Sequence, residues 1–177
     1  MRDAVLAVFA ALSCIVPTAC ANAKGNGNAK ASSSVNQGIK EGDQAPTFSV
    51  DSVNGRGKVT ITPGKVTLVD FWATWCVPCK KNFAKYQEIY EKYKSRGLEI
   101  AAVSVDDEKG NVSAFAAASG VTFPVGWDEG RKIESQFQLS GVPTLYIIGK
   151  DGTVKYKHLG GSAGSEMRID QEIQSLL

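Results

Sequence analysis

The sequence predicts an α/β domain in which helices flank a central mixed β-sheet. Two runs, at 66–72 and 98–105, are almost entirely apolar or β-branched, which is typical of strands covered on both faces. Stretches of helical periodicity follow each run, and an Asp-Gly pair before residues 153–159 is typical of a β-hairpin. Strand, helix and strand, followed by helix, hairpin and helix, is the order expected of a sheet that packs against helices.

The composition agrees with one globular domain and excludes several classes of protein. The chain has 177 residues, of which 43% are hydrophobic and 21% charged, so it resembles neither a disordered chain nor a collagen. Lysine and arginine number 20 against 18 aspartate and glutamate, which gives a formal net charge of +2. Because no strong basic field results, we do not expect nucleic acid as a partner.

Residues 1–23 are typical of an export signal. Residues 4–16 are apolar or small, too few for the about 20 residues of a membrane-spanning helix but enough for the core of a secretory signal. Two cleavages stay open: at Cys20, which would become the lipidated first residue of a membrane-anchored lipoprotein, or after Ala23 at an A-x-A site. The polar residues 24–37 are expected to form a flexible linker. Either cleavage places the domain outside the cytoplasm, in the periplasm or at the outer face of the cell envelope, where dithiols can be oxidised.

The folded domain is expected over residues 38–177 and begins with a β-hairpin. Thr47–Val53 and Lys58–Thr62 have the composition of short strands, and Asn-Gly-Arg-Gly at 54–57 joins them as a turn. The first fully buried strand then follows at 66–72.

Helical periodicity sets in from Val77 to Arg96, directly after the first buried strand. Its aromatic residues fall on one stripe, which is expected to face the core, and the glycine at 97 is a natural helix end. The remaining elements are expected, in chain order, as a strand at 98–105, a helix at 111–119, an extended piece at 123–125, a helix at 131–137, a strand at 143–148, a hairpin strand at 153–159 and a helix from about 165 to 177.

The chemical centre of the sequence is a pair of cysteines between a buried strand and a helix. Cys76 lies at or just before the helix start, where free N–H groups and the helix dipole favour an anion, so the pKa of its thiol should fall. Cys79 is one turn further on, and Pro78 fits the first turn, where its missing N–H is not needed. We expect a cycle in which Cys76 attacks a substrate disulfide and Cys79 then displaces the substrate, leaving a Cys76–Cys79 disulfide.

A structural zinc site and an inert disulfide are the alternatives for this cysteine pair. Zinc needs four ligands, whereas the domain offers only the pair and His158. A disulfide that closes so short a loop contributes little to stability, and its place at a helix start makes it labile. The sequence therefore favours a redox-active disulfide and predicts no metal.

Two further residues are candidates for the same site. Asp70 lies inside an apolar strand, on the face it shares with Leu68 and Trp72, where it would lie beneath the cysteines and accept the proton of Cys79. A solvated position at a sheet edge is the alternative. Pro143 precedes a buried strand, where proline removes a ladder hydrogen bond, so it indicates either a special turn with a cis peptide bond or an edge strand.

Three motifs together resemble the thioredoxin superfamily. They are VDFWATWCVPCK at 69–80, GVPTLYIIGKDGTV at 141–154 and a late glycine pair at 160–161. The leader, the linker and the opening EGDQAPTFSVDSVNGRGKVTI at 41–61 resemble the exported thioredoxin-like disulfide reductases of the TlpA/ResA type. The resemblance covers residues 38–177 and implies a thioredoxin fold with an N-terminal hairpin and a helix–strand insertion near 107–136.

The resemblance also implies the residues of the site. Cys76 and Cys79 would be the catalytic pair and Asp70 a catalytic buried acid, with a cis-proline facing the pair across a substrate groove. Val142 would offer backbone hydrogen bonds to a client chain. Thioredoxins carry a lysine near the acid, but Ala102 takes that position here, so the pKa of Asp70 is expected to be higher. The implied substrate-binding residues are Trp72, Trp75, Val77, Pro78, Val142 and Pro143.

The resemblance implies a thiol–disulfide oxidoreductase that works outside the cytoplasm, as a reductase of protein disulfides. Its clients would be cysteine-containing proteins, such as apocytochrome c during cytochrome c maturation, copper-site cysteines or misoxidised proteins. An electron donor in the membrane would keep the pair reduced. No cofactor is implied, and the protein is expected to be a monomer.

Two other activities stay open. A copper chaperone on this fold would combine two cysteines with a distant histidine, for which His158 is the candidate, although such chaperones space their cysteines C-x-x-x-C. A thiol peroxidase would share the APTFSV-like opening but needs a P-x-x-x-T-x-x-C pattern. Here Thr74 stands two residues before Cys76, and the proline is missing.

Overall fold

The computed structural model describes residues 38–160 and 165–177. The expected signal at 1–23, with Cys20, and the expected linker at 24–37 lie outside the described residues.

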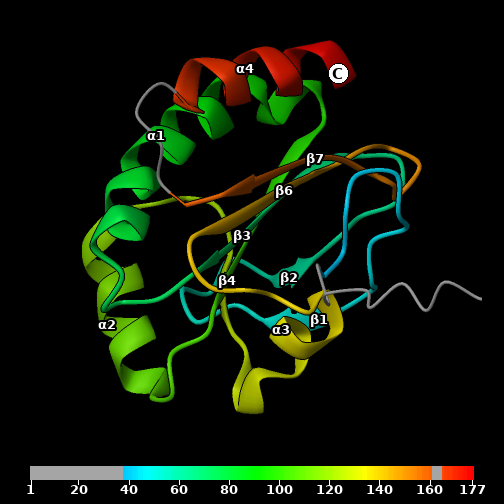
Figure 1. The fold of residues 1–177 in the computed structure, drawn as a ribbon. Coiled ribbons are helices and arrows are strands. Elements are labelled where there is room, and N and C mark those ends of the chain that lie inside the picture. The colour runs from blue at the N-terminus through cyan, green and yellow to red at the C-terminus, as the bar shows by residue number, and fades with distance from the viewer. Residues whose placement is uncertain (1–37, 161–164) are drawn as a thin grey trace, which may run out of the picture. The chain divides into compact units, whose positions relative to one another are not determined.

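A five-stranded sheet in the order β5-β4-β3-β6-β7 forms the centre of the domain (Figure 1). Every residue of the middle strand, β3 (Val66–Trp72), is buried. On one side β4 (Leu98–Ser104) runs parallel to it, and on the other side β6 (Thr144–Ile148) runs antiparallel to it. The outer strands are β5 (Val125–Trp127), parallel to β4, and β7 (Val154–Leu159), antiparallel to β6. The predicted mixed sheet is thus confirmed, and the two apolar runs form β3 and β4.

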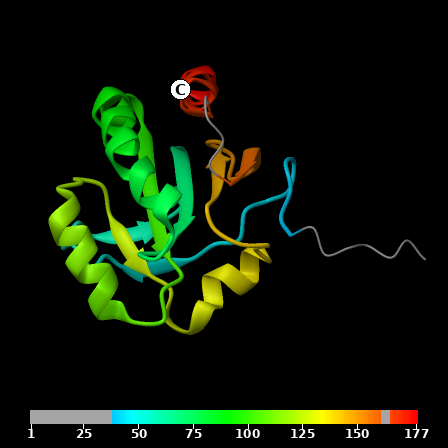
Figure 2. The ribbon, with the colours of Figure 1, turned by 60° about the vertical axis from the view of Figure 1, so that its left-hand side comes forward.

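Helices cover both faces of this sheet. Figure 1 shows α1 and α4 together above the sheet and α3 below it, and the turned view of Figure 2 keeps this arrangement. An ion pair of 3.0 Å between Lys92 and Asp170 joins α1 to α4. The helices are α1 (Val77–Tyr93), α2 (Lys109–Ser119), α3 (Lys132–Phe137) and α4 (Ser165–Leu176).

Aromatic side chains of β3 show which helices pack on which face. Trp72 contacts Phe83 of α1 and Phe115 of α2, with ring centroids 4.6 and 4.9 Å apart. Its neighbour Phe71 points to the opposite face and contacts Phe137 of α3, at 4.9 Å. Neighbouring strand residues point to opposite faces, so α1 and α2 share one side of the sheet and α3 lies on the other.

Several element boundaries differ from the sequence prediction. β5 begins at Val125, because Pro124 has no N–H to donate and the ring of Phe123 is buried against α1. α1 ends at Tyr93, and a 3₁₀ turn, η1 (Lys94–Arg96), continues it to a left-handed Gly97 (φ 101°). A second 3₁₀ turn, η2 (Glu129–Arg131), precedes α3.

The predicted N-terminal hairpin is present and covers one edge of the sheet. β1 (Ser49–Asp51) and β2 (Lys58–Thr60) pair in antiparallel. Beyond β1, the N–H of Val53 donates to the carbonyl of Val125 at 2.7 Å, and Ser52 forms a bridge with Gly126. The hairpin therefore occupies the outer side of β5.

The opening segment covers the other edge of the sheet. The N–H of Gly42 donates to the carbonyl of Val154, and the N–H of Val154 donates to the carbonyl of Asp43, both at 2.9 Å. Nearby, the backbone N–H of Lys157 donates to the Glu41 carboxylate at 3.1 Å. Residues 41–43 thus lie along the outer side of β7.

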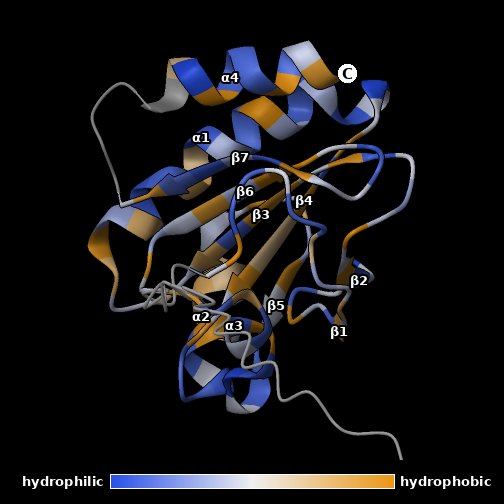
Figure 3. Ribbon diagram, turned by 45° about the vertical axis from the view of Figure 1, so that its right-hand side comes forward, coloured by the Kyte–Doolittle hydropathy of each residue, from blue (hydrophilic) through white to orange (hydrophobic). Residues whose placement is uncertain are grey.

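The hydrophobic residues gather along the strands and on the inner sides of the helices (Figure 3). In α4 the predicted apolar stripe is confirmed, since Ile169 and Ile173 are buried and Leu176 and Leu177 are partly buried. Across the described ranges, the structure contains no helix with the length and apolar character that crossing a membrane requires.

Candidate redox site

The candidate site lies where β3 ends and α1 begins. Cys76 is the N-cap of α1: its backbone is extended (φ −84°, ψ 97°), and its sulfur accepts a 3.3 Å hydrogen bond from the N–H of Cys79. A disulfide joins the two cysteines, whose Cα atoms are 5.3 Å apart. The free N–H groups and positive dipole end of α1 therefore face the Cys76 sulfur, where they would stabilise a thiolate once the disulfide is reduced.

The two cysteines of the pair differ in exposure. Cys76 keeps 5% of its surface exposed, whereas Cys79 has none. A disulfide or thiol from outside can therefore approach Cys76 more readily than Cys79. This difference agrees with the predicted roles, in which Cys76 attacks and Cys79 resolves.

Asp106 holds the loop that leads into Cys76. Its carboxylate accepts hydrogen bonds from the backbone N–H of Thr74 at 2.8 Å and from the Thr74 hydroxyl at 2.6 Å. The Ser104 hydroxyl donates to the same carboxylate at 2.6 Å, and the indole N–H of Trp127 donates to the Asp106 carbonyl at 2.7 Å. Asp106 is 4% exposed, so these bonds replace water and fix the loop against the end of β4.

The sequence analysis missed Asp106. The one available signal is its place directly after a buried strand, at the carboxyl ends of parallel strands where α/β sheets carry their sites. Asp107 carries the same signal, yet its side chain is 84% exposed and pairs with Arg131 on the surface at 3.2 Å. The sequence pattern does not distinguish these two aspartates.

Asp70 is a fully buried carboxyl in the middle strand, so the alternative of a solvated edge position is wrong. Burial raises the pKa of Asp70 to about 8, and the Tyr86 hydroxyl lowers it by a smaller amount. Neither carboxylate oxygen has a hydrogen-bond partner among the described residues. The register neighbours of Asp70 are Ala102 and Leu145, so no cation stands beside it in the sheet, and its pKa is high, as the sequence predicts.

The structure corrects the predicted role of Trp72 in substrate binding. Its side chain has no exposed surface and is packed between Phe83 and Phe115. A residue buried in this way cannot line a substrate groove. Trp72 instead supports the site from within the core, because the strand side that it shares with Asp70 faces α1.

The exposed residues beside Cys76 fit the predicted docking surface better. Trp75 and Val77 are 64% and 57% exposed, and Pro78 is exposed as well. Large apolar side chains on a surface mark sites of protein interaction. These three residues therefore remain candidates for contact with a client chain.

Pro143 lies at the same end of the sheet as the cysteines. The Val142–Pro143 peptide bond is cis, so the special turn, rather than the edge strand, is correct. Thr144 pairs with Phe71 near the carboxyl end of β3, which places Pro143 close to the strand end that leads to Cys76. Pro143 is buried and Val142 is partly buried.

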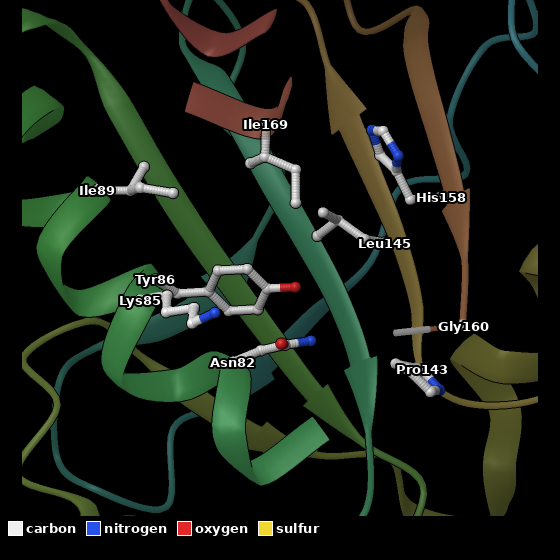
Figure 4. A pocket seen from close by; sticks show the side chains of 9 residues that line it. All are labelled: Asn82, Lys85, Tyr86, Ile89, Pro143, Leu145, His158, Gly160 and Ile169. Atoms are coloured by element: carbon white, nitrogen blue, oxygen red, sulfur yellow. The ribbon is translucent and has the colours of Figure 1, made fainter. Parts of the chain in front are cut away.

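A small pocket opens beside Pro143, between α1, β6, β7 and α4 (Figure 4). It encloses about 20 Å³, and its walls include Asn82 and Tyr86 of α1 and His158 of β7. The Nε2 atom of His158 lies 2.7 Å from a Glu172 carboxylate oxygen of α4, so this histidine is paired with a carboxylate. Among residues 38–160 and 165–177, no three His, Cys, Asp or Glu side chains gather as a metal would require.

Comparison with known proteins agrees with this geometry. Residues 41–157 match the model of the AhpC/TSA family. The chain belongs to the AhpC/TSA family. The family's thiol-disulfide oxidoreductase ResA from Bacillus subtilis (strain 168) is 39% identical over 119 residues, which are 67% of this chain and 66% of that protein. ResA from Geobacillus thermodenitrificans is 35% identical over 139 residues, 78% of this chain and 79% of that protein.

Solved structures of similar fold confirm the thioredoxin-like architecture of this AhpC/TSA chain. A Chlorobium tepidum protein assigned as the thiol:disulfide interchange protein DsbE superimposes with a TM-score of 0.72 at 29% identity, covering 78% of this chain and 98% of that one. A thioredoxin family protein from Chlorobium tepidum TLS gives a TM-score of 0.67 at 23% identity, over 77% and 97% of the two chains. The predicted thioredoxin fold and the predicted kinship with ResA-type proteins are both confirmed.

Proposed function

We propose that this protein reduces protein disulfides outside the cytoplasm, with Cys76 and Cys79 as its redox pair. Its relatives named thiol-disulfide oxidoreductase ResA support this class of reaction, and the direction of electron flow and the location are the parts that we propose. The disulfide between Cys76 and Cys79 is the observation that supports it most. Cys76 caps α1 and keeps a small exposed surface, whereas Cys79 is buried, and Asp70 is buried on the same side of the sheet. Such a pair can open and close by thiol–disulfide exchange.

The proposed cycle starts from the reduced pair. The Cys76 thiolate attacks a client disulfide, forms a mixed disulfide with one client sulfur and releases the other as a thiolate. The ionised Asp70 carboxylate takes the proton of Cys79, and the resulting thiolate attacks the Cys76 sulfur. The Cys76–Cys79 bond forms as the bond to the client breaks, so two electrons pass to the client, which leaves as a dithiol.

The same proposal includes partners and place. Clients are cysteine-containing proteins, among which apocytochrome c, copper-site proteins and misoxidised proteins fit the chemistry. They would dock on the exposed Trp75, Val77 and Pro78, and on the backbone of Val142 before Pro143. A membrane electron donor would reduce the pair again, and Cys20 would anchor the monomeric protein if it is lipidated.

A turnover assay tests the proposed function. The purified protein should catalyse reduction of the insulin interchain disulfides by dithiothreitol, and Cys76→Ser should abolish the catalysis because no other described cysteine can attack. Glu88→Gln, an exposed change on the outer face of α1, serves as the matched control and should leave the rate unchanged.

The reduction potential of the pair tests the direction of electron flow. A value near that of thioredoxin, about −270 mV, is expected of a reductase. A value near that of the oxidant DsbA, about −120 mV, would contradict the proposed direction. Rapid turnover of hydrogen peroxide, or tight Cu(I) binding that His158→Ala abolishes, would contradict the proposed class of reaction.

A further inference from the structure

Two lysines follow the cysteine pair directly on α1. Lys80 and Lys81 are exposed, and neither side chain forms a hydrogen bond or an ion pair among the described residues. Lys92 and Lys94, at the other end of the helix, are both paired with carboxylates. Two cations without a partner therefore stand beside the redox site.

Helix geometry directs both lysines toward the cysteine pair. Lys80 lies one turn after Cys76, and its backbone N–H donates to the Cys76 carbonyl at 3.2 Å. Lys81 lies one turn after Val77, which is 57% exposed. Residues four apart share one side of a helix, and helical side chains lean toward the N-terminus. The two ammonium groups therefore border the cysteine that keeps some exposure and the apolar surface next to it.

This position is unfavourable for the helix itself. The N-terminus of a helix carries a partial positive charge, which favours acidic residues in the first turn and disfavours cations. α1 has no acidic residue in its first turn, and its first two charged residues are Lys80 and Lys81. A departure from local preference is expected where residues serve a function, so these two lysines are candidates for a role in the redox site.

The other side of the site adds little exposed net charge. After β4, Asp107 is paired with Arg131 at 3.2 Å, and the exposed Glu108 is followed by the exposed Lys109. The carboxylate of Asp106 is buried and accepts hydrogen bonds within its own loop. The unbalanced charge at the surface of the site therefore comes from the start of α1.

We propose that Lys80 and Lys81 select client polypeptides that carry carboxylates next to their reactive cysteine. This inference rests on the proposed function and adds the chemical class of its clients. Trp75 and Val77 contact the client chain, and the two ammonium groups at the edge of this apolar surface pair with aspartate or glutamate side chains of the client. Attraction between opposite charges speeds the encounter, and repulsion disfavours clients with basic residues in the same place.

Three matched peptides test this selection. Each has one cysteine joined by a disulfide to a 2-thiopyridyl group, with glutamate, glutamine or lysine on both sides of the cysteine. The Cys76 thiolate attacks the peptide sulfur, the disulfide breaks, and pyridine-2-thione leaves and is followed by its absorbance. Each rate is divided by the rate of the same peptide with 2-mercaptoethanol, which removes differences in the reactivity of the peptides themselves.

The reduced wild-type protein should favour the glutamate peptide over the glutamine peptide about tenfold at low ionic strength, because two exposed ion pairs form. The lysine peptide should be the slowest of the three. In about 1 M salt, where the screening length is about 3 Å, the preference should fall to about twofold.

Two double variants test the lysines. Lys80→Gln with Lys81→Gln should lower the preference to about twofold, and Lys80→Glu with Lys81→Glu should reverse it, so that the lysine peptide becomes the fastest. Neither change should unfold the protein, because cations near a helix start are unfavourable. Lys92→Gln with Lys94→Gln is the matched control. It removes the same charge about 18 Å further along the helix and should keep the tenfold preference.

The outcomes separate selection of clients from other roles. If Lys80→Gln with Lys81→Gln slowed all three peptides equally, the preference would stay tenfold and the proposal would be overturned, because the lysines would act on the Cys76 thiolate instead of the client. A wild-type protein without the preference, or its equal loss in the control, would also overturn the proposal and leave the proposed function intact. A wild-type protein that reacts with none of the peptides would overturn the proposed function as well.

Discussion

At the scale of single residues, burial of the Asp70 carboxyl lowers the stability of the folded domain whenever this group is ionised. An ionised carboxyl in the core has lost its water, and among the described residues neither oxygen of Asp70 has a hydrogen-bond partner that would compensate for it. The protein therefore holds the acid in its protonated form over much of the physiological range. Buried acids with a raised pKa are common where they serve a reaction. A pKa of about 8 is suitable for exchanging a proton with a thiol.

The raised pKa of Asp70 predicts how stability depends on pH. The folded protein binds the proton with a pKa of about 8, whereas the unfolded chain binds it near the ordinary value of 3.8. Between these values the folded state holds more protons, so the free energy of unfolding should fall as pH rises, by up to about 1.4 kcal/mol per pH unit. Denaturant unfolding of the oxidised protein at a series of pH values measures this slope.

Asp70→Asn should flatten that slope, because the buried group no longer titrates. Asp51→Asn is the control, since Asp51 is exposed and its pKa is lowered by Lys58, so its contribution is lost only at acidic pH. A slope that persists in Asp70→Asn would show that another group is responsible.

At the scale of elements, the loop between β3 and α1 depends on a residue from the neighbouring strand. Asp106 follows β4, and its carboxylate accepts hydrogen bonds from the backbone N–H and the hydroxyl of Thr74, two residues before Cys76. The N-cap position of Cys76 thus depends on the parallel pairing of β3 with β4. Pairing of strand ends is what places the site at this edge of the sheet.

Asp106→Ala should destabilise the protein by about 2 kcal/mol, because it leaves the partly buried donors of Thr74 and the buried hydroxyl of Ser104 without a partner. It should also slow the attack of Cys76 on an aromatic disulfide. Asp107→Ala, at the adjacent exposed position, should cost less than about 1 kcal/mol and leave the attack rate unchanged. Urea unfolding and stopped-flow absorbance measure the two effects, and equal values for both variants would contradict this role for Asp106.

Local signals were sufficient to predict most elements, whereas contacts between distant segments were not. Apolar runs predicted β3 and β4 within one residue, because burial on both faces leaves a continuous pattern. The burial of Trp72 and the pairing of His158 with Glu172 depend on sheet register and helix placement. Neither leaves a mark in the local sequence, so the prediction placed Trp72 in the groove and did not give the partner of His158.

At the scale of the whole molecule, the site presents an apolar surface around the one cysteine of the pair that keeps some exposure. Trp75 and Val77 stand out from a domain whose other apolar side chains are mostly covered. The buried partner, Cys79, is shielded from the client until Cys76 has reacted. The order of the two steps is therefore built into the position of the pair at the start of α1.

Cys79→Ser should trap clients on Cys76 as mixed disulfides, because attack on the client proceeds but displacement does not. Non-reducing electrophoresis of an envelope extract, followed by mass spectrometry, identifies the trapped proteins. The variant with both Cys76→Ser and Cys79→Ser should trap none. Identical bands in the two variants would count against Cys76 as the attacking residue.

The covered edges of the five-stranded sheet have a consequence for self-association. Exposed outer strands are templates on which identical chains can stack into fibrils. Here the hairpin donates a hydrogen bond to the backbone carbonyl of Val125. Residues 41–43 form hydrogen bonds with the backbone at the start of β7. Chains crowded together at high concentration would find these backbone groups already hydrogen-bonded, and removal of residues 38–45 should free the start of β7 and increase association of chains through this strand.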